Sequence, residues 1–519
     1  MSRRLFGQNG SDSTLYARDA EVAIAQQAQQ APPRPLPVGF WHHDLYKVRK
    51  HAAKKYPQTV LMLFVFVMAV LLLYWAVLFR VEEKMSALTV HVVDFDGQAP
   101  FDDVDPFVGP MVTELALQTN DLDRPTLGFS VLSPAEFNND PIAVRQSVYD
   151  EHCFAAIIVN ANASSMLMSA VLNGNTSYDP TGAVQYILLS ARDETAYSNY
   201  IYPQLQTFSD TLMAQFGTVW TQSLTGSSSV TKDMLARAPS AVNPGIAPLK
   251  IDLRPFGPPT ATPSVTIGLI YLIIMAFFSF AFFFPIHQQF VIPAGHRPLH
   301  FWQFILWRWL ATTVSYIFIS LAYSLVSLSY QIPFWKPPAS PTEVALNASA
   351  YGRGSFPVYW MINFVGMVAL GLASENVTMV IGQPWTALWL IFWVITNVAT
   401  AFYTLDLAPD FFRWGYAWPL YNIVQASRTV LFDLHSRIGL NFGVLFIWVA
   451  INSILYPFCC HFMRWRIERE KRAAEKSKGQ FAVDTPPPAP APLPPVSDRG
   501  HSQDVGASPT SIISFWKGR

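Results

Sequence analysis

The chain has 519 residues, of which 51% are hydrophobic and 13% are charged, and its 35 basic and 35 acidic residues give a net charge of zero. A soluble domain carries about 25% charged residues, so this composition indicates a membrane protein. Only three cysteines occur, and Cys153 is alone in the largest polar segment, which excludes a disulfide framework there. We expect neither a nucleic-acid partner nor a cofactor.

The first 57 residues are expected to form a cytosolic tail. Residues 1 to about 35 are rich in Gln, Ala, Ser and Pro and are expected to be disordered. The segment that follows combines aromatic residues with a basic cluster, directly before the first apolar run. It either lies on the anionic cytoplasmic leaflet or simply supplies the positive charge that flanks a span on its cytosolic side.

Six segments are long and apolar enough to cross a bilayer, whose core requires roughly 20 helical residues. Basic residues collect before the first segment and after the last, so both termini are expected to be cytosolic, in the plasma membrane or an endomembrane. The last five segments form a membrane domain at 264–462, followed by a cytosolic tail at 463–519 that is basic and then Pro-rich, a potential ligand of SH3 or WW modules. The predicted spans are 58–79, 264–285, 305–329, 357–380, 384–404 and 440–462.

Residues 80–263, between the first two spans, are acidic and long enough to form a domain on the non-cytosolic side. Apolar and amphipathic patterns predict a mixed α/β fold, and the Pro-rich end at 238–263 is expected to be an extended tether. The predicted strands are 87–95, 153–161 and 184–190, and the predicted helices are 105–118, 141–152 and 194–220. Asn162, Asn175 and, between the third and fourth spans, Asn347 are candidate N-glycosylation sites, because the six-span topology places all three outside.

The usual anchors of enzyme chemistry are missing from the sequence. It contains no GxxxxGK[ST] phosphate loop, HExxH helix, GxSxG elbow or CxxC pair, so we do not expect an enzyme, and any ATP-driven work requires a separate ATPase. The adjacent Cys459 and Cys460 either carry S-palmitoyl chains or pack as apolar residues.

Ionisable residues are scarce within the predicted spans. Arg308 and Glu375 are the main candidates for an ion-coupled pathway, and both lie near span ends. Asn363, Asn397 and Asn452 lie deeper, where helix packing is favoured over a route for a polar headgroup.

The segment 418–436, between the last two spans, is too charged to cross the bilayer. A helix that begins at Pro419 places an apolar face opposite a polar one. We therefore expect a helix at the outer membrane interface, with one face in lipid or protein and the other in water, which could cap a pathway. The residues singled out in it are Trp418, Pro419, Tyr421, Asn422, Arg428 and Asp433.

One span, a large outer domain and five further spans with an amphipathic segment before the last resemble the ABC-2-type permease architecture, in the branch that includes phage-infection-protein-like membrane proteins. LTVHVVDFDG and HCFAAIIVNANASSML are similar to strands of that branch's outer domain. RWGYAWPLYNIVQASRTVLFD, continuing as LHSRIGLNFGVLFIW, resembles the closing region of the fungal nitrosoguanidine-resistance family. The likeness runs from about residue 38 to about 470.

The resemblance implies a fungal protein linked to xenobiotic resistance and to membrane lipid organisation, with no catalytic residues to transfer. Two functions follow. The first is a permease-like protein that exports or relocates lipids or amphipathic compounds. The second is a scaffold or regulator that does not transport and that binds flippases or other transporters.

Overall fold

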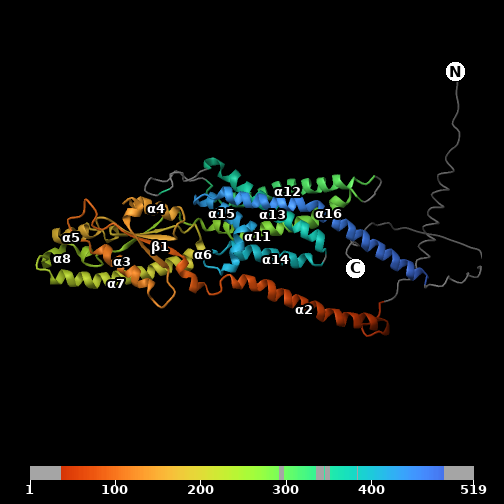
Figure 1. Cartoon of the computed structure of the whole chain (residues 1–519), viewed down its shortest axis with the longest axis horizontal. Coiled ribbons are helices and arrows are strands. Elements are labelled where there is room, and N and C mark those ends of the chain that lie inside the picture. Colours follow the sequence, from red (N-terminus) through yellow and green to blue (C-terminus); the bar gives the residue numbers. More distant parts are fainter. Residues whose placement is uncertain (1–36, 292–296, 335–343, 345–350, 383, 484–519) are drawn as a thin grey trace, which may run out of the picture.

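The computed structural model describes residues 37–291, 297–334, 344, 351–382 and 384–483. The N-terminal residues expected to be disordered, the acceptor Asn347 and the Pro-rich tail lie outside these ranges. Figure 1 shows an elongated molecule, with a sheet and its helices at one end and a bundle of long helices at the other. The start of α2 and the end of α16 both lie at the end away from the sheet.

The prediction of several membrane-spanning helices is confirmed, because five helices are long and apolar enough to cross a membrane. The expected span at 384–404 is the apolar helix α14 (Thr386–Ala401), whose 16 residues are about 24 Å long and fall short of a hydrocarbon core of about 30 Å. The sequence had predicted six spans of similar length. The five longer helices contain α2 (Tyr46–Ala76), α11 (Ile270–Gln288), α12 (Phe301–Ser329), α13 (Ser355–Ile381) and α16 (Ile438–Val483).

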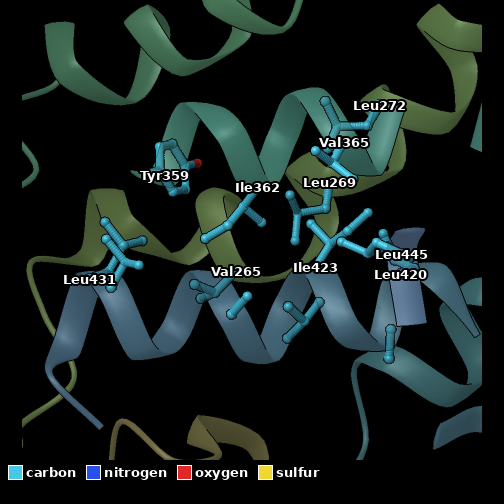
Figure 2. Close-up of a cluster of buried hydrophobic side chains, with 14 of the residues drawn as sticks. Val265, Leu269, Leu272, Tyr359, Ile362, Val365, Leu420, Ile423, Leu431 and Leu445 are labelled. Atoms are coloured by element: carbon cyan, nitrogen blue, oxygen red, sulfur yellow. The ribbon is translucent and has the colours of Figure 1, made fainter. Parts of the chain in front are cut away.

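Helix α13 forms the centre of the bundle and packs against α11, α12, α14, α15 and α16. In its most apolar window 78% of the residues are buried, against 11% for α2, which lies at the periphery. Figure 2 shows side chains of α13, among them Tyr359, Ile362 and Val365, packed against Ile423 of α15 (Pro419–Phe432) and its neighbours. A methyl group at Gly366 would lie 2.5 Å from Ile423, so the close approach of α13 and α15 requires glycine there.

The sheet has the order β2-β1-β3-β4-β5, with β3 and β4 antiparallel and the other neighbouring strands parallel. Every residue of β3 is buried, which its uninterrupted AAIIV sequence explains, because both faces of a central strand are covered. The strands are β1 (Thr89–Asp94), β2 (Gly128–Leu132), β3 (Ala155–Val159), β4 (Val184–Leu188) and β5 (Pro248–Asp252).

The helices of this domain include α7, whose buried residues recur along one face, as its amphipathic sequence predicts. The helices are α3 (Val108–Asn120), α4 (Pro141–Tyr149), α5 (Ala163–Asn173), α6 (Glu194–Ala196), the π-helical η5 (Tyr197–Ile201), α7 (Tyr202–Gly226), α8 (Lys232–Arg237) and α9 (Pro239–Val242), with α10 (Thr262–Val265) leading to the bundle. The short 3₁₀ helices are η1 (His43–Leu45), η2 (Val81–Ala87), η3 (Pro134–Phe137), η4 (Pro180–Gly182), η6 (Pro259–Ala261), η7 (Ile267–Leu269), η8 (Gly352–Gly354) and η9 (Asp410–Ala417).

Three expectations about segment boundaries change. The Pro-rich segment 238–263 is not simply a tether, because its middle forms β5 and hydrogen-bonds to β4. The basic cluster before the first span occupies the first turns of α2 itself. Helix α16 continues past the predicted end of the last span, so the basic start of the C-terminal tail is helical.

Helix α15 differs most from its prediction. The sequence placed a helix at 418–436 with one face in water, whereas the structure buries nearly all of Pro419–Phe432, including Asn422 and Arg428. Its polar face meets the α/β domain, while its other side packs on α13, α14 and α16. A protein surface has taken the place of water, and it supplies partners for some of the same polar groups.

Candidate functional site

The α/β domain is joined to the bundle by a buried ion pair. Arg254, which follows β5, donates from Nε and Nη2 to Oδ2 of Asp433 at 3.2 and 3.0 Å, and from Nε to the Asp433 carbonyl oxygen at 3.1 Å. Asp433 ends α15 in the left-handed conformation, with φ at 56°. That backbone turn points the end of α15 at the last strand of the domain, and the ion pair holds it there.

Two longer contacts with acidic side chains lie beside this ion pair. His435 Nδ1 is 3.3 Å from Asp150 Oδ1, and Arg437 Nη2 is 3.5 Å from Glu151 Oε2. Both acidic residues come directly after α4, so the end of α4 lies against the chain that leaves α15. Burial, followed by the charge of Asp433, raises the pKa of the neighbouring Tyr149 to about 12.

A polar cavity of about 220 Å³, which we call the junction cavity, lies between the domain and the bundle. Arg428 of α15 lines it and is 2% exposed. Its Nη1 donates to the carbonyl oxygen of Arg192 at 2.8 Å, while its buried Nε has no hydrogen-bond partner in the part of the chain that the structure describes. The lining residues are Glu151, Phe154, Arg192, Asp193, Ala401, Tyr403, Thr404, Leu405, Asp406, Tyr416, Tyr421, Gln425, Arg428 and Arg437.

The domain side of this cavity is held in place by polar contacts. Arg192 donates from Nη1 to the Cys153 carbonyl oxygen at 2.8 Å, and its guanidinium carbon lies 3.8 Å from the centre of the Phe154 ring. Burial raises the pKa of Glu194, and the positive charge of Arg428 opposes that rise. Glu194 is therefore an acidic neighbour of Arg428, although the two form no ion pair.

The bundle side of the cavity comes from the segment after α14 and from η9. Tyr416 donates from its hydroxyl to Asp406 Oδ1 at 3.5 Å, and its ring packs edge-on against Tyr421, with the ring centres 5.2 Å apart. The hydroxyl of Tyr403 lies 3.3 Å from that of Tyr74 on α2. This wall is aromatic and acidic, whereas the opposite wall is basic.

The start of α15 is anchored in the bundle. Asn397 of α14 accepts a hydrogen bond from the Leu420 backbone N–H at 3.1 Å, which satisfies one of the amide groups that a helix start leaves unpaired. Asn422 donates to the Trp418 carbonyl oxygen at 2.9 Å and accepts from Asn441 of α16 at 3.0 Å. These contacts fix the helix that carries Arg428.

The residues singled out in the interfacial segment therefore separate into three groups. Tyr421 and Arg428 line the cavity, and Asp433 forms the buried ion pair. Trp418, Pro419 and Asn422 belong to the anchored start of the helix. No local pattern in the sequence connects Arg192 or Asp406 with this helix, and only the fold brings them to the same cavity.

A second polar cluster lies inside the bundle. Arg308 of α12 donates from Nε to Glu375 Oε1 of α13 at 2.8 Å, and Tyr456 of α16 donates to the same oxygen at 2.8 Å. Arg308 is 0% exposed, and its guanidinium lies over the rings of Phe280 and Phe284 of α11 at 5.3 Å each. The sequence had identified Arg308 and Glu375 as the main candidates for an ion-coupled pathway, and the fold pairs them with each other.

Several polar atoms of this cluster have no partner among the described residues. They include Nη1 of Arg308, Oε2 of Glu375 and both ring nitrogens of His287, which is buried at the end of α11 and interacts electrostatically with the pair. His287 therefore belongs to this buried cluster.

The three asparagines of the spans form hydrogen bonds between elements, which agrees with the helix-packing alternative. Asn363 donates to Ser324 at 3.0 Å, Asn397 accepts from Leu420, and Asn452 accepts from Asn376 at 3.1 Å. The structure places none of them on the cavity described above.

The candidate modification sites differ in exposure. Asn175 is exposed, whereas Asn162 is half-buried and Ser164 of its acceptor triplet donates to the buried Asp96. Cys460 is buried with its sulfur 3.6 Å from that of Met379, and Cys459 is half-buried. Within the described ranges, no three His, Cys, Asp or Glu side chains are placed to hold a metal ion.

These features define a multi-pass membrane protein in which an α/β domain is docked on a helical bundle through a buried interfacial helix. The family model described as "Protein of unknown function (DUF3533)" matches residues 59–454, and the chain belongs to that family. It is 24% identical over 465 residues to an uncharacterized endoplasmic reticulum membrane protein of Saccharomyces cerevisiae. The matched region covers 84% of this chain and 85% of the yeast protein. No solved structure matches the chain.

Proposed function

We propose that this protein is a permease-like membrane protein that relocates lipids or other amphipathic molecules and performs no enzymatic chemistry. The observation that carries this proposal is the Arg308–Glu375 pair, which four helices surround inside the bundle. An ionisable residue within a membrane segment is expensive and usually marks a transport pathway or a relay. The unpaired atoms of the pair support a second arrangement of these helices in which they find partners.

A purely structural role explains the pair less well. Exchanging a buried ion pair for apolar residues of similar volume is often neutral or stabilising by about 1–4 kcal/mol. A scaffold therefore gains little from keeping Arg308 and Glu375 in the bundle. In a permease the pair has a function, because it can form in one conformation and break in another and so stabilise the two conformations differently.

The test uses the full chain reconstituted in liposomes, with headgroup-labelled lipids, in the presence and absence of ion gradients and candidate ATPases. Arg308→Met combined with Glu375→Leu is expected to stay folded and to abolish lipid movement. The matched control is Arg464→Met with Glu468→Leu, which removes an exposed pair at 2.9 Å on α16 and should leave movement unchanged. Undiminished movement in the first double variant would refute the role of the pair, and no movement by the unmodified chain would refute the permease proposal.

The size of the junction cavity bears on the link to drug tolerance. Pockets for drug-sized ligands usually measure about 300–1,000 Å³, and this cavity measures about 220 Å³. It suits a small polar group better than a xenobiotic molecule. We therefore propose that any effect on drug tolerance acts through lipid organisation.

The alternative function is a membrane scaffold or regulator that does not transport and that binds flippases or other transporters. The observation that favours it is an open groove of about 550 Å³ between α3 and α7, on the domain surface, where Val219 is 51% exposed. Proximity labelling in cells distinguishes the two functions. A stable transporter partner that is lost in Val219→Glu would favour the scaffold.

We further propose that both termini are cytosolic and that the α/β domain is extracytoplasmic. The common position of the start of α2 and the end of α16, opposite the domain, supports this orientation. The relative's endoplasmic reticulum location favours an endomembrane over the plasma membrane. Protease protection of tagged termini in sealed microsomes tests the orientation.

A further inference from the structure

The charged groups of the junction cavity are sorted between its two walls. Of its six charged residues, Glu151 is paired with Arg437 at 3.5 Å, and Asp193 caps α6 by accepting from the Ala196 N–H at 2.9 Å. The remaining three are the basic pair Arg192 and Arg428 on the side of the domain and α15, and the exposed Asp406 on the side of η9. The cavity thus presents the two guanidinium groups, beside the capping carboxylate of Asp193, on one wall and the carboxylate of Asp406 on the other.

The basic wall has the features of a preformed binding site. Arg428 is buried and fixed by its bond to the Arg192 carbonyl oxygen, yet its Nε has no hydrogen-bond partner in the described part of the chain. A buried donor on a charged group is costly to leave without a hydrogen bond, so a native protein is expected to provide an acceptor for it. A phosphate oxygen is the acceptor that guanidinium groups bind best.

The opposite wall fits a cation. Asp406 supplies a carboxylate, and the rings of Tyr403, Tyr416 and Tyr421 line the same space. Aromatic rings attract quaternary and primary ammonium groups through their negative faces, and desolvation strengthens that attraction. A ligand with a phosphate at one end and an ammonium at the other matches both walls.

The position of the cavity selects a lipid as the source of that ligand. The cavity begins at the last residue of α14, Ala401, and Tyr403 touches α2 near its end, so it lies at the boundary of the bundle where headgroups are found. The neighbouring apolar cluster of Val77, Leu405 and Phe412 joins α2 to η9. Acyl chains would extend along this surface and the exposed apolar face of α2.

We propose that the junction cavity binds the zwitterionic headgroup of a phospholipid, with its phosphate at Arg428 and Arg192 and its ammonium at Asp406 and the tyrosine rings. This inference rests on the proposed function and names the class of amphipathic molecule that the permease recognises. Arg437, already paired with Glu151, orients the wall without contacting the lipid.

The test measures equilibrium binding to the purified full-length protein by isothermal titration calorimetry. The probes are dihexanoylphosphatidylcholine, dihexanoylphosphatidylglycerol, phosphocholine and inorganic phosphate. The unmodified chain is expected to bind the choline lipid saturably and more tightly than the other three. Arg428→Gln should weaken this binding at least about tenfold, because it removes a charge-assisted hydrogen bond.

Asp406→Asn should remove the preference for the choline lipid over the glycerol lipid, while Arg413→Gln serves as the matched control. Arg413 is exposed and paired with Asp410 at 3.1 Å, outside this cavity, and its variant should bind like the unmodified chain. If Arg428→Gln does not yield monodisperse protein, the exposed Asp406 provides the decisive variant.

Three results would overturn the proposal. They are no saturable binding of the choline lipid, unchanged binding by a folded Arg428→Gln protein, and binding of phosphocholine or phosphate as tight as that of the lipid, which would identify a soluble ligand. The measurement requires no transport, so the two proposals fail separately. Lipid movement without binding at this cavity refutes the site alone, and binding without movement refutes the permease alone.

Discussion

Replacing Asp433 by asparagine tests whether the buried ion pair docks the α/β domain on the bundle. Removing one partner of a buried pair costs about 3–5 kcal/mol, and the Asn oxygen restores one neutral hydrogen bond of about 1 kcal/mol. The side chains of Arg254 and Asp433 are only 7% and 10% exposed, so little solvent screening reduces this cost. The expected loss is about 2–4 kcal/mol, which weakens docking roughly a hundredfold.

Asparagine is the informative replacement because it also tolerates the left-handed backbone at this position. Alanine would add about 1–2 kcal/mol of backbone strain and confuse the two effects. The matched control is Asp410→Asn, which removes an exposed carboxylate 3.3 Å from Lys84, where solvent screens the ion pair.

The assay combines thermal unfolding, followed by tryptophan fluorescence, with limited proteolysis of the purified full chain. In Asp433→Asn, the domain is expected to unfold in a separate, earlier transition and to be cut at the junction. Asp410→Asn should behave like the unmodified chain. Identical transitions and cleavage in the two variants would refute the docking role of the ion pair.

Three further predictions concern the domain and the last helix. Burial raises the pKa of Asp94 from 3.8 to about 6 in the folded chain. The free energy of unfolding is therefore expected to fall as pH rises from about 4 to 6, because the carboxyl group ionises more readily in the unfolded chain. Asp94→Asn should raise the free energy of unfolding above pH 6, and this gain should vanish below pH 4. The pKa shift limits the gain in stability to about 3 kcal/mol, and partial solvent access reduces it to about 1 kcal/mol. Equal changes in the unfolding temperature at pH 4 and pH 7 would contradict this prediction. Mobility shifts after endoglycosidase treatment should show a larger effect for Asn175→Gln than for Asn162→Gln, because Asn175 is the exposed acceptor; the reverse order would contradict this. Acyl-exchange labelling should depend on Cys459 and not on the buried Cys460, and signal that survives Cys459→Ser would count against this.

Local patterns were sufficient to predict the elements with strong sequence signals. The uninterrupted apolar run of β3 predicts a buried strand, and the long apolar runs predict membrane-spanning helices, because an element surrounded by apolar groups requires apolar residues throughout. The strand β5 was missed because Pro248 and its charged residues resemble a loop, and only pairing with β4 makes it a strand. Tertiary pairing overrode the local preference there.

The candidate site was only partly predictable. The sequence identified Arg428 and Asp433 as unusual in an apolar region, but it assigned their polar face to water. Their partners Arg192 and Arg254 lie more than 170 residues away along the chain, and no local pattern connects such distant positions. The pairing of Arg308 with Glu375 was hidden for the same reason.

The unequal burial of α2 and α13 has a consequence for how this sequence can change over time. Side chains on α2 such as those of Phe64 and Leu72 are exposed and do not pack against the rest of the chain, so we expect any apolar side chain of similar hydrophobicity to serve there. Positions on α13 such as Gly366 are constrained by a particular neighbouring side chain. Homologous chains should therefore diverge freely along the first span while the central helix keeps its residue sizes.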